Sequence, residues 1–379
     1  MPTASPRPPA AILDLAYRRA SKNTAKPIVR GVEIAAQVEY VCRNIQNRAG
    51  VRLLMACLLA KIHNPAVDVR KPYTEIGEPD SFSGRRYDEE HITDFINEHQ
   101  LPCNPTTAFL TPPLRNRNTT LTADLNLVGR PPRLYQTILH LLDQVFSKGV
   151  SPDDLLAEIV RWLLVIRDEQ KQRMETLLAA LQTSEDAISL SSEAIVKLIE
   201  QHLNCRNSSR LPVLIIAAAY QAASEHLGER VLPLASHNAA DRQTGALGDV
   251  EITLVSDNEV ATCYEMKDKR VTVADINRAL QKIAESGNRV DNYIFITTDI
   301  IDDEVRAFAA SVYERTGGIE IVILDCIGFL RHFLHLFHRL RMQFLEEYQR
   351  FVLAESESAI SQPLKEAFLA LRQAAETGG

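Results

Sequence analysis

The feature that most constrains the fold is an alternation of short β-rich runs with helical segments after Gly228. In chain order we expect strands at 250–255, 260–266, 293–297 and 319–324, and helices at 273–285, 302–315 and 328–353. The first two strands are separated by a short polar turn, which is typical of a hairpin. The pattern predicts an α/β (α+β) domain with a mixed sheet that opens with an antiparallel hairpin.

The chain before this region predicts mainly helical structure. Residues 1 to about 30 are rich in proline, alanine and arginine, and we expect a flexible arm around one short helix at 11–20. Much of the proline lies between 65 and 134, which excludes long regular elements there except a helix near 89–99. Further helices are expected at 32–48, 51–62, 151–181, 191–203 and 209–227. We therefore predict an arm over 1–30, a mainly helical domain over 31–205 and the α/β domain over 206–379.

Composition excludes several classes of protein. Of the 379 residues 45% are hydrophobic, yet no apolar run is long enough to cross a bilayer, and the start lacks the pattern of a secretory signal. The six cysteines form no CxxC pair, so their spacing predicts neither a structural zinc site nor a redox motif. We expect a cytoplasmic protein without a membrane partner.

An acid opens one predicted strand, and the next strand carries an acid and a lysine two residues apart. Asp249 opens the first strand of the expected hairpin, and Glu265 and Lys267 lie at the end of the second. Side chains two apart on a strand share a face, so Glu265 and Lys267 project to one side while Tyr264 and Met266 project to the other. Two of the three polar groups are therefore neighbours whatever the hairpin register.

Whether Asp249 joins them depends on that register. A three-residue loop that ends at a left-handed Asn258 pairs Val255 with Glu259 and brings Asp249 opposite Glu265. A symmetric four-residue turn shifts the register by one and separates the two acids. A metal site needs both acids close together, so we predict the bulged loop. This register puts four side chains on one face: Asp249, Glu251, Glu265 and Lys267.

This cluster has a defined chemical use. Two carboxylates about a cation's width apart bind a hard divalent ion, and the backbone carbonyl of Met266 is a third candidate ligand. Such an ion stabilises charge on a phosphate and lowers the pKa of a bound water, which Lys267 holds for in-line attack. We therefore predict Mg²⁺-dependent phosphodiester hydrolysis, with Asp249, Glu265 and Lys267 as the catalytic residues and the two acids as metal ligands.

The order of an acid, fifteen intervening residues and then Glu-Met-Lys resembles the active-site signature of the PD-(D/E)xK nuclease superfamily. The resemblance covers about 209–324. Together with the segment 81–89, this core is most similar to type II restriction endonucleases of the SacI-like family. Gly248 departs from the pattern, because it stands where the name of the superfamily implies proline.

Three further residues are open to two interpretations each. The resemblance implies an accessory carboxylate late on the helix before the sheet, which points to Glu225, and an exposed surface acid is the alternative. Glu251 is either a third acid near the metal or the solvent-facing partner in the strand alternation. Lys269 either contacts a phosphate or belongs to a solvated strand end.

Candidate DNA contacts gather in the proline-rich segment. The chain has a formal charge of -7, which is unfavourable for approach to a polyanion, but 103–133 holds four arginines against one acid. Arginine pairs with guanine and asparagine with adenine, so we predict contacts within 109–133; a loop held by its own prolines and capping asparagines is the alternative. The candidates are Asn104, Arg115, Asn116, Arg117 and Asn118, with Arg85 and Arg86 in the earlier segment.

The sequence therefore predicts a type II restriction endonuclease that cuts double-stranded DNA at a specific sequence. A palindromic double-strand cut needs two active sites related by a two-fold axis, so we expect a homodimer, and restriction implies a cognate DNA methyltransferase. A modification-dependent or structure-guided nuclease with the same core is one alternative. A DNA-binding protein with a vestigial nuclease core is another, against which the intact set of three site residues argues.

Overall fold

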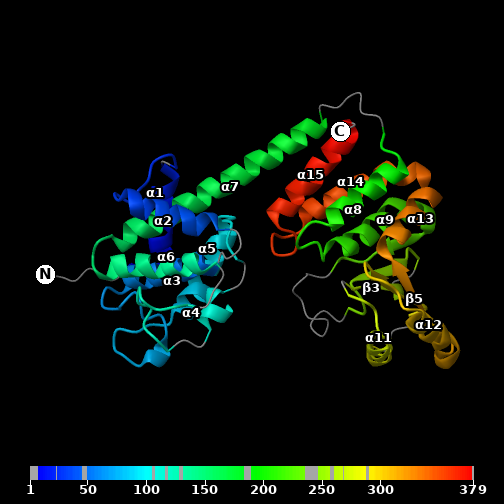
Figure 1. Ribbon diagram of the computed structural model, residues 1–379, viewed down its shortest axis with the longest axis horizontal. Coiled ribbons are helices and arrows are strands. Elements are labelled where there is room, and N and C mark those ends of the chain that lie inside the picture. The colour runs from blue at the N-terminus through cyan, green and yellow to red at the C-terminus, as the bar shows by residue number, and fades with distance from the viewer. Residues whose placement is uncertain are drawn as a thin grey trace. The chain divides into compact units, whose positions relative to one another are not determined.

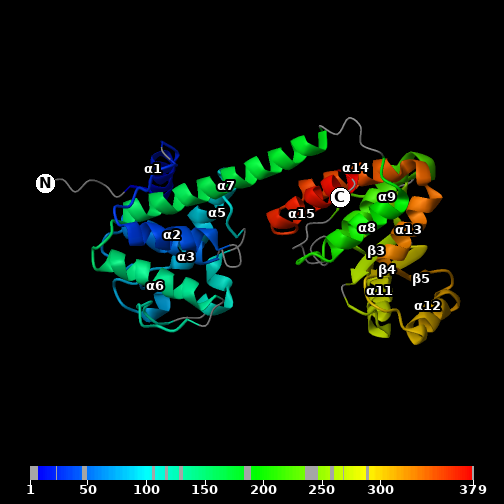
Figure 2. The same cartoon turned by 45° about the horizontal axis from the view of Figure 1, so that its top comes forward.

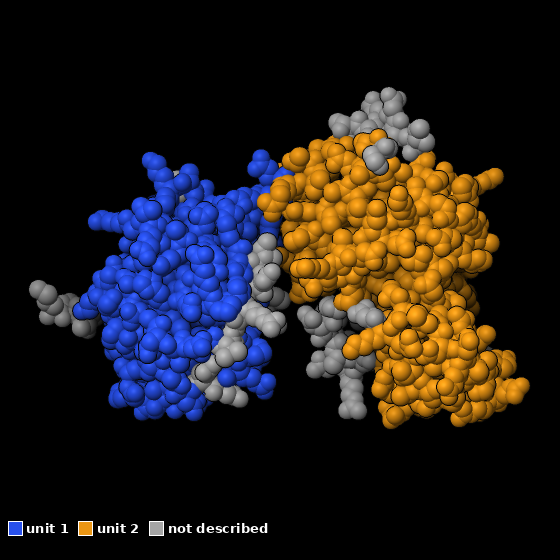
Figure 3. Space-filling model, in the orientation of Figure 1, with its two compact units in different colours: residues 1–172 blue, residues 173–379 orange. Residues whose placement is uncertain are grey.

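The computed structural model describes residues 7–22, 24–44, 49–104, 107–115, 118–127, 131–182, 189–234, 246–256, 260–267, 269–286 and 290–377. The chain divides into two compact units, residues 1–172 (unit 1) and 173–379 (unit 2), which Figure 3 distinguishes by colour. The division lies earlier than the boundary expected at 205. Helix α8 (Ser192–Leu203) explains the difference, since its Ile195, Leu198 and Ile199 are buried in the same apolar core as the sheet of unit 2.

Unit 1 is helical, as the sequence predicts. Its centre is α3 (Ala49–His63), in which every residue from Ala49 to Ala60 is buried, because the segment is apolar around almost its whole circumference. The other helices are α1 (Pro9–Lys22), α2 (Val32–Arg43), α4 (Gly84–Tyr87), α5 (Thr93–Glu98), α6 (Pro132–Phe146) and the first part of α7 (Pro152–Gln182), whose last residues belong to unit 2. A π-helical turn, Asp88–Ile92, joins α4 to α5, so the helix expected at 89–99 is interrupted.

The N-terminal segment differs from the flexible arm that its composition suggests. Helix α1 is amphipathic, and its apolar residues Ile12, Leu13, Ala16 and Ala20 are buried in the core of unit 1. This burial fixes 9–22 as part of the folded unit. Residues 1–6 lie outside the described part of the chain.

Unit 2 contains a five-stranded mixed sheet in the order β1-β2-β3-β4-β5. The strands are β1 (Glu229–Val231), β2 (Val250–Leu254), β3 (Val260–Lys267), β4 (Asn292–Thr297) and β5 (Glu320–Asp325). The pairs β1–β2 and β2–β3 are antiparallel, whereas β3–β4 and β4–β5 are parallel. The predicted mixed sheet with an opening hairpin is confirmed.

Helices cover both faces of this sheet (Figures 1 and 2). One core combines sheet residues such as Tyr264 and Ile296 with α9 (Leu211–Leu227), α13 (Cys326–Leu336), α14 (Arg341–Ala354) and α15 (Gln362–Thr377). The other core packs Cys263, Tyr293 and Phe295 against α11 (Val273–Ser286) and α12 (Asp303–Thr316). Parallel strands are expected to be covered on both faces, because their crossover helices lie there.

Two parts of unit 2 differ from the sequence prediction. The helix expected at 328–353 is two helices, α13 and α14, with a 3-10 turn at His338–Leu340 between them. Strand β1, which has three residues, and helix α15 were not among the predicted elements, although the buried Leu364, Phe368 and Leu369 of α15 follow a helical spacing. Across the described residues, no helix has both the length and the apolar character that crossing a membrane requires.

Candidate active site

The hairpin of β2 and β3 brings the two predicted acids to adjacent positions. Val250 pairs with Tyr264, and the Asp249 N–H donates to the Tyr264 carbonyl oxygen at 2.8 Å. The next position outward on each strand is therefore occupied by Asp249 and Glu265. This agrees with the predicted register, in which Asp249 lies opposite Glu265.

The device that sets the register differs from the predicted one. Ile252 pairs with Thr262 but Thr253 pairs with Val260, so Ala261 is an extra residue in β3, a β-bulge. The one-residue shift occurs inside the strand instead of in the loop. The predicted pairing of Val255 with Glu259 cannot be compared, because Glu259 lies outside the described residues.

Gly248 has a steric reason to be glycine. A Cβ atom at this position would lie 2.6 Å from the Tyr264 carbonyl oxygen, which is closer than real Cβ contacts. Proline also carries a Cβ atom, so the close approach of the two strands explains why proline is absent here. The departure from the superfamily pattern is thus part of how this hairpin brings Asp249 to β3.

The carboxylate of Asp249 contacts the backbone of β3. Its Oδ2 accepts the Met266 N–H at 2.7 Å, so the side chain takes the place of a further backbone pair beyond the end of β2. The N–H and C=O of one residue point to the same side of a strand. The Met266 carbonyl oxygen consequently faces the same side as Asp249.

Glu265 is held from three directions. Lys267 Nζ lies 2.6 Å from Oε1 of Glu265. Oε2 of Glu265 lies 3.6 Å from Lys282 Nζ and also accepts a hydrogen bond from the Tyr293 hydroxyl. The Tyr293 hydroxyl is also 2.9 Å from the carbonyl oxygen of Leu247, two residues before Asp249. Tyr293 therefore links Glu265 to the chain that enters β2.

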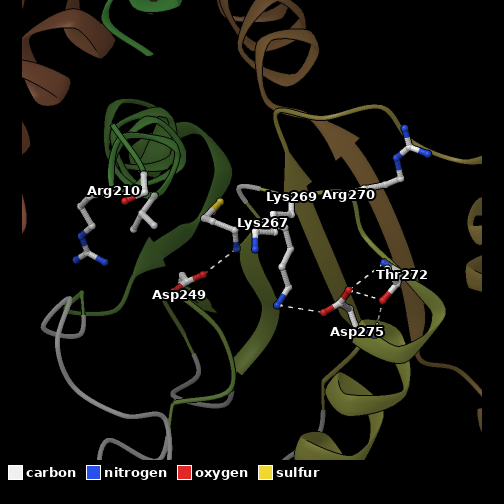
Figure 4. A pocket seen from close by; sticks show the side chains of 10 residues that line it. Arg210, Asp249, Lys267, Lys269, Arg270, Thr272 and Asp275 are labelled. Carbon is white, nitrogen blue, oxygen red and sulfur yellow. Dashed lines mark hydrogen bonds and ion pairs between the residues drawn. The ribbon is translucent and has the colours of Figure 1, made fainter. Parts of the chain in front are cut away.

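Lys267 lies between two carboxylates. Besides Glu265, its Nζ is 3.4 Å from Oδ1 of Asp275 at the start of α11 (Figure 4). Burial lowers the pKa of Lys267, but the bonds to Glu265 and then Asp275 outweigh it and raise the pKa above its ordinary value. The ammonium group is therefore charged at neutral pH.

Asp275 caps α11 in addition to holding Lys267. Its Oδ2 accepts the N–H and the hydroxyl of Thr272 at 2.9 and 2.6 Å, which is the geometry of a capping box. Burial raises the pKa of Asp275, but the bonds from Thr272 and the charges of Lys267 and Arg278 bring it down to about 2. The carboxylate is therefore ionised at neutral pH, where it holds Lys267.

Several of these groups line a pocket of about 540 Å³, although Glu265 is not among its lining residues. Asp249, Met266, Lys267 and Asp275 line it (Figure 4), and so do three further cations, Arg210, Lys269 and Arg270. Arg210 lies 2.8 Å from Glu355 and Arg270 lies 3.1 Å from Asp302. The lining holds more cations than carboxylates, which is suited to an anionic substrate.

The segment that builds this pocket has a recognisable relative. Residues 187–298 match the SacI restriction endonuclease C-terminal domain. The match confirms the SacI-like resemblance and includes Asp249, Glu265 and Lys267, but it covers less than a third of the chain. No curated protein matches the chain.

Two further acids of this SacI-like segment were candidates for the metal. Glu251 lies on the predicted face, but its Oε1 accepts the N–H of Leu247 at 2.6 Å and so holds the entry of β2. Glu225 is exposed on α9 and does not line the pocket. Among the described residues no group of three or more His, Cys, Asp or Glu side chains is placed to hold a metal. A metal site here would consist of two carboxylates and a backbone carbonyl.

The predicted DNA contacts outside the SacI-like segment lie in unit 1. Asn116 and Arg117 fall outside the described residues, and Asn118 is exposed. Asn104 is half-buried, and its carbonyl oxygen accepts a hydrogen bond from Arg52. Arg86 is exposed and pairs with Glu90. Arg85 and Arg115 line one pocket of unit 1, while Lys269 lines the catalytic pocket.

The sequence did not reveal four residues of the site. Tyr293, Lys282 and Asp275 reach the predicted catalytic side chains from β4 and α11, and Arg210 reaches the pocket from the start of α9. The contact of Asp275 with Lys267 joins the start of α11 to the end of β3, which spacing along the chain does not show. The pairing of Cys263 with Tyr293 in the β3–β4 register is what directs Tyr293 to the face of Glu265.

Proposed function

We propose that this protein is a Mg²⁺-dependent type II restriction endonuclease of the PD-(D/E)xK kind, which hydrolyses phosphodiester bonds of double-stranded DNA at a specific sequence. The observation that carries the proposal is the position of Asp249 opposite Glu265 in the hairpin, with Lys267 paired to Glu265. Asp249 and Lys267 line a pocket that is also lined by additional cations. The match of this segment to a restriction endonuclease domain supports the same reaction.

The donor atoms at this site fit magnesium. Asp249 and Glu265 supply carboxylate oxygens, and the Met266 carbonyl faces the side where Asp249 lies. Mg²⁺ prefers oxygen ligands and commonly binds through one or two carboxylates with the remaining positions left to water and phosphate. When bound, the ion supplies charge stabilisation at the phosphate and a bound water of lowered pKa.

The protein's own residues orient the reacting groups. Lys267 is charged and shared by two carboxylates, so Asp275 still anchors it when an oxygen of Glu265 turns toward a cation. From that position its N–H groups donate to the attacking water and to a phosphate oxygen. Tyr293 and Lys282 fix the second oxygen of Glu265, which limits how far this carboxylate moves during the reaction.

The cationic lining accounts for DNA binding by an acidic chain. Lys269 and Arg270 are exposed at the pocket, and the ion pair of Arg270 with Asp302 is at the surface, where such pairs contribute little. Both side chains are thus able to turn to phosphates at small cost. The local excess of positive charge, and not the net charge of -7, determines the field that the scissile strand meets.

A double-strand cut by this site requires a second copy of it, so we propose a homodimer that acts in the cytoplasm and is accompanied by a cognate DNA methyltransferase. The test is incubation of plasmid DNA with the full chain and Mg²⁺, with Lys267→Ala as the inactive variant and Lys197→Ala, an exposed lysine on α8, as the matched control. Discrete fragments support the proposal. A smear indicates a modification-dependent or structure-guided nuclease, and no cleavage indicates a vestigial site.

A further inference from the structure

Unit 1 contains a second pocket, of about 260 Å³, which shares no residue with the catalytic pocket. Three segments form it: Pro72–Glu75, Ser83–Arg85 and Phe109–Arg115. Its buried lining is apolar, from Pro72, Phe109 and Leu114, whereas its exposed lining includes Arg85, Arg115 and Glu75. An apolar floor with a few charged groups around it is typical of a ligand site.

The pocket is rigidly built. A Cβ atom on Gly84 would lie 2.4 Å from Phe109 Cζ and 2.8 Å from Pro72 Cβ, so the absence of a side chain lets α4 pack directly on both neighbours. Asp88, just beyond α4, accepts the Thr107 hydroxyl and the Ala108 N–H, each at 2.7 Å. These contacts hold the loop that carries Arg115 against the segment that carries Arg85.

A fully buried ion pair supports the same junction. Arg52 on α3 donates to Asp88 at 2.8 Å and to the carbonyl oxygen of Asn104 at 2.6 Å. Both charged side chains have no exposed surface. The hydroxyl of Tyr73 adds a bond to the Leu114 carbonyl at 3.1 Å. The arrangement is therefore set before any ligand arrives, which reduces the entropy cost of binding.

The charged groups at the rim indicate the chemistry of the ligand. Arg85 pairs with Glu89 one helical turn away, and both side chains are about half exposed, so this pair contributes only a few tenths of a kcal/mol and yields readily to a phosphate. Glu75 would repel a phosphate. A carboxylate does, however, accept a hydrogen bond from the exocyclic amino group of cytosine.

We propose that this pocket is a DNA-recognition site, in which Arg85 and Arg115 hold phosphates of one strand while Glu75 accepts a hydrogen bond from a base amino group between them. Phosphate contacts position the protein on DNA and base contacts supply specificity, so the two arginines and the glutamate have different roles. The inference rests on the proposed endonuclease function, because it names how that enzyme recognises its substrate.

The test measures binding of the full chain to a duplex that contains the cleavage site, mapped by sequencing the ends of plasmid fragments. Fluorescence anisotropy is recorded in Ca²⁺ over a range of salt concentrations. The variants are Arg85→Ala/Arg115→Ala and Glu75→Ala, and the control is Arg18→Ala/Arg30→Ala, which removes two exposed arginines elsewhere in unit 1.

We expect the Arg85→Ala/Arg115→Ala variant to reduce the slope of log affinity against log salt by roughly one to two, as the loss of two phosphate contacts requires. The control should leave the slope unchanged. Glu75→Ala should strengthen binding to unrelated DNA and lower discrimination against sites with one altered C·G pair by about 5- to 150-fold.

Each outcome has a separate meaning. If the wild type neither binds nor cuts DNA, the proposed function fails. If it binds and cuts, but the double variant matches its control in salt slope, the recognition site is elsewhere and this inference alone is overturned. An unchanged discrimination in Glu75→Ala overturns the base contact. A circular dichroism melt confirms that the variants are folded.

Discussion

Replacement of Tyr293 by phenylalanine tests how the site holds Glu265. Tyr293 is fully buried, and its hydroxyl contacts Oε2 of Glu265 and the Leu247 carbonyl oxygen. Burial and then the charge of Glu265 raise the pKa of this phenol, so it remains protonated and donates its hydrogen bond at the pH of any assay. Phenylalanine retains the ring in the core and removes only these two contacts.

The expected effect is on metal binding more than on folding. A hydrogen bond to a charged group contributes about 1.5–3 kcal/mol, and loss of a group that orients a metal ligand typically lowers metal affinity or activity about 10- to 100-fold. We therefore expect the Mg²⁺ concentration for half-maximal plasmid cleavage to rise about tenfold or more in Tyr293→Phe. Cleavage at saturating Mg²⁺ should fall less.

Tyr264→Phe is the matched control. Tyr264 is also buried, on the neighbouring strand, but its hydroxyl bonds to the Tyr220 hydroxyl at 2.7 Å on the opposite face of the sheet. Both variants lose one buried hydroxyl group and should show a similar small fall in melting temperature. If the two variants shift the Mg²⁺ dependence equally, or if Tyr293→Phe cleaves like wild type at limiting Mg²⁺, then Tyr293 does not position Glu265.

Three other perturbations have expected outcomes. Lys267→Ala should abolish cleavage and leave DNA binding in Ca²⁺ within a few fold, and an equal loss of binding and cutting would contradict the role of Lys267 in activating water. Asp249→Ala should also abolish cleavage, with only a small fall in melting temperature. Asp88→Ala leaves the buried Arg52 charge unpaired, so calorimetry should show unit 1 destabilised by about 3–5 kcal/mol, and a loss below about 1 kcal/mol would contradict this account of the pair. Burial lowers the pKa of His202 to about 4, below its unfolded value near 6.5, so the folded state disfavours protonation of this side chain. The free energy of unfolding should therefore fall as the pH drops from about 6.5 to 4, by about 3 kcal/mol at most. Urea melts should show a weaker pH dependence for His202→Gln.

Elements with strong local signals were predictable from the sequence. Helix α7 begins at Pro152 after Ser151, whose hydroxyl accepts the Asp154 N–H, as the Ser-Pro-Asp-Asp pattern indicates. The hairpin strands and α11 were also found close to their observed limits, because alternation and a helical stripe are visible within a few residues. The break between α13 and α14 was not, because Phe337 and Leu340 continue the apolar pattern through it.

In the candidate site, too, local features were predictable from the sequence and others were not. The identity of Asp249, Glu265 and Lys267 and their common face follow from spacing along two neighbouring strands. The register that joins the two acids was correct at the site, but for a local reason that the sequence does not show. The bulge at Ala261 supplies the one-residue shift that was assigned to the loop, and either device is compatible with the same residues.

The sequence by itself determined which side chains are candidates for catalysis in this protein and which of them share a strand face, because these depend on periods of a few residues. Only the tertiary structure decided what surrounds them: Tyr293 and Asp275 reach the site from β4 and α11, and Arg85 and Arg115, about thirty residues apart in the chain, line one pocket. Such contacts depend on strand register, on close approaches such as that at Gly84, and on buried pairs such as Arg52 with Asp88. They depend on how helices and strands that are distant in the sequence pack together, which no local sequence pattern reveals.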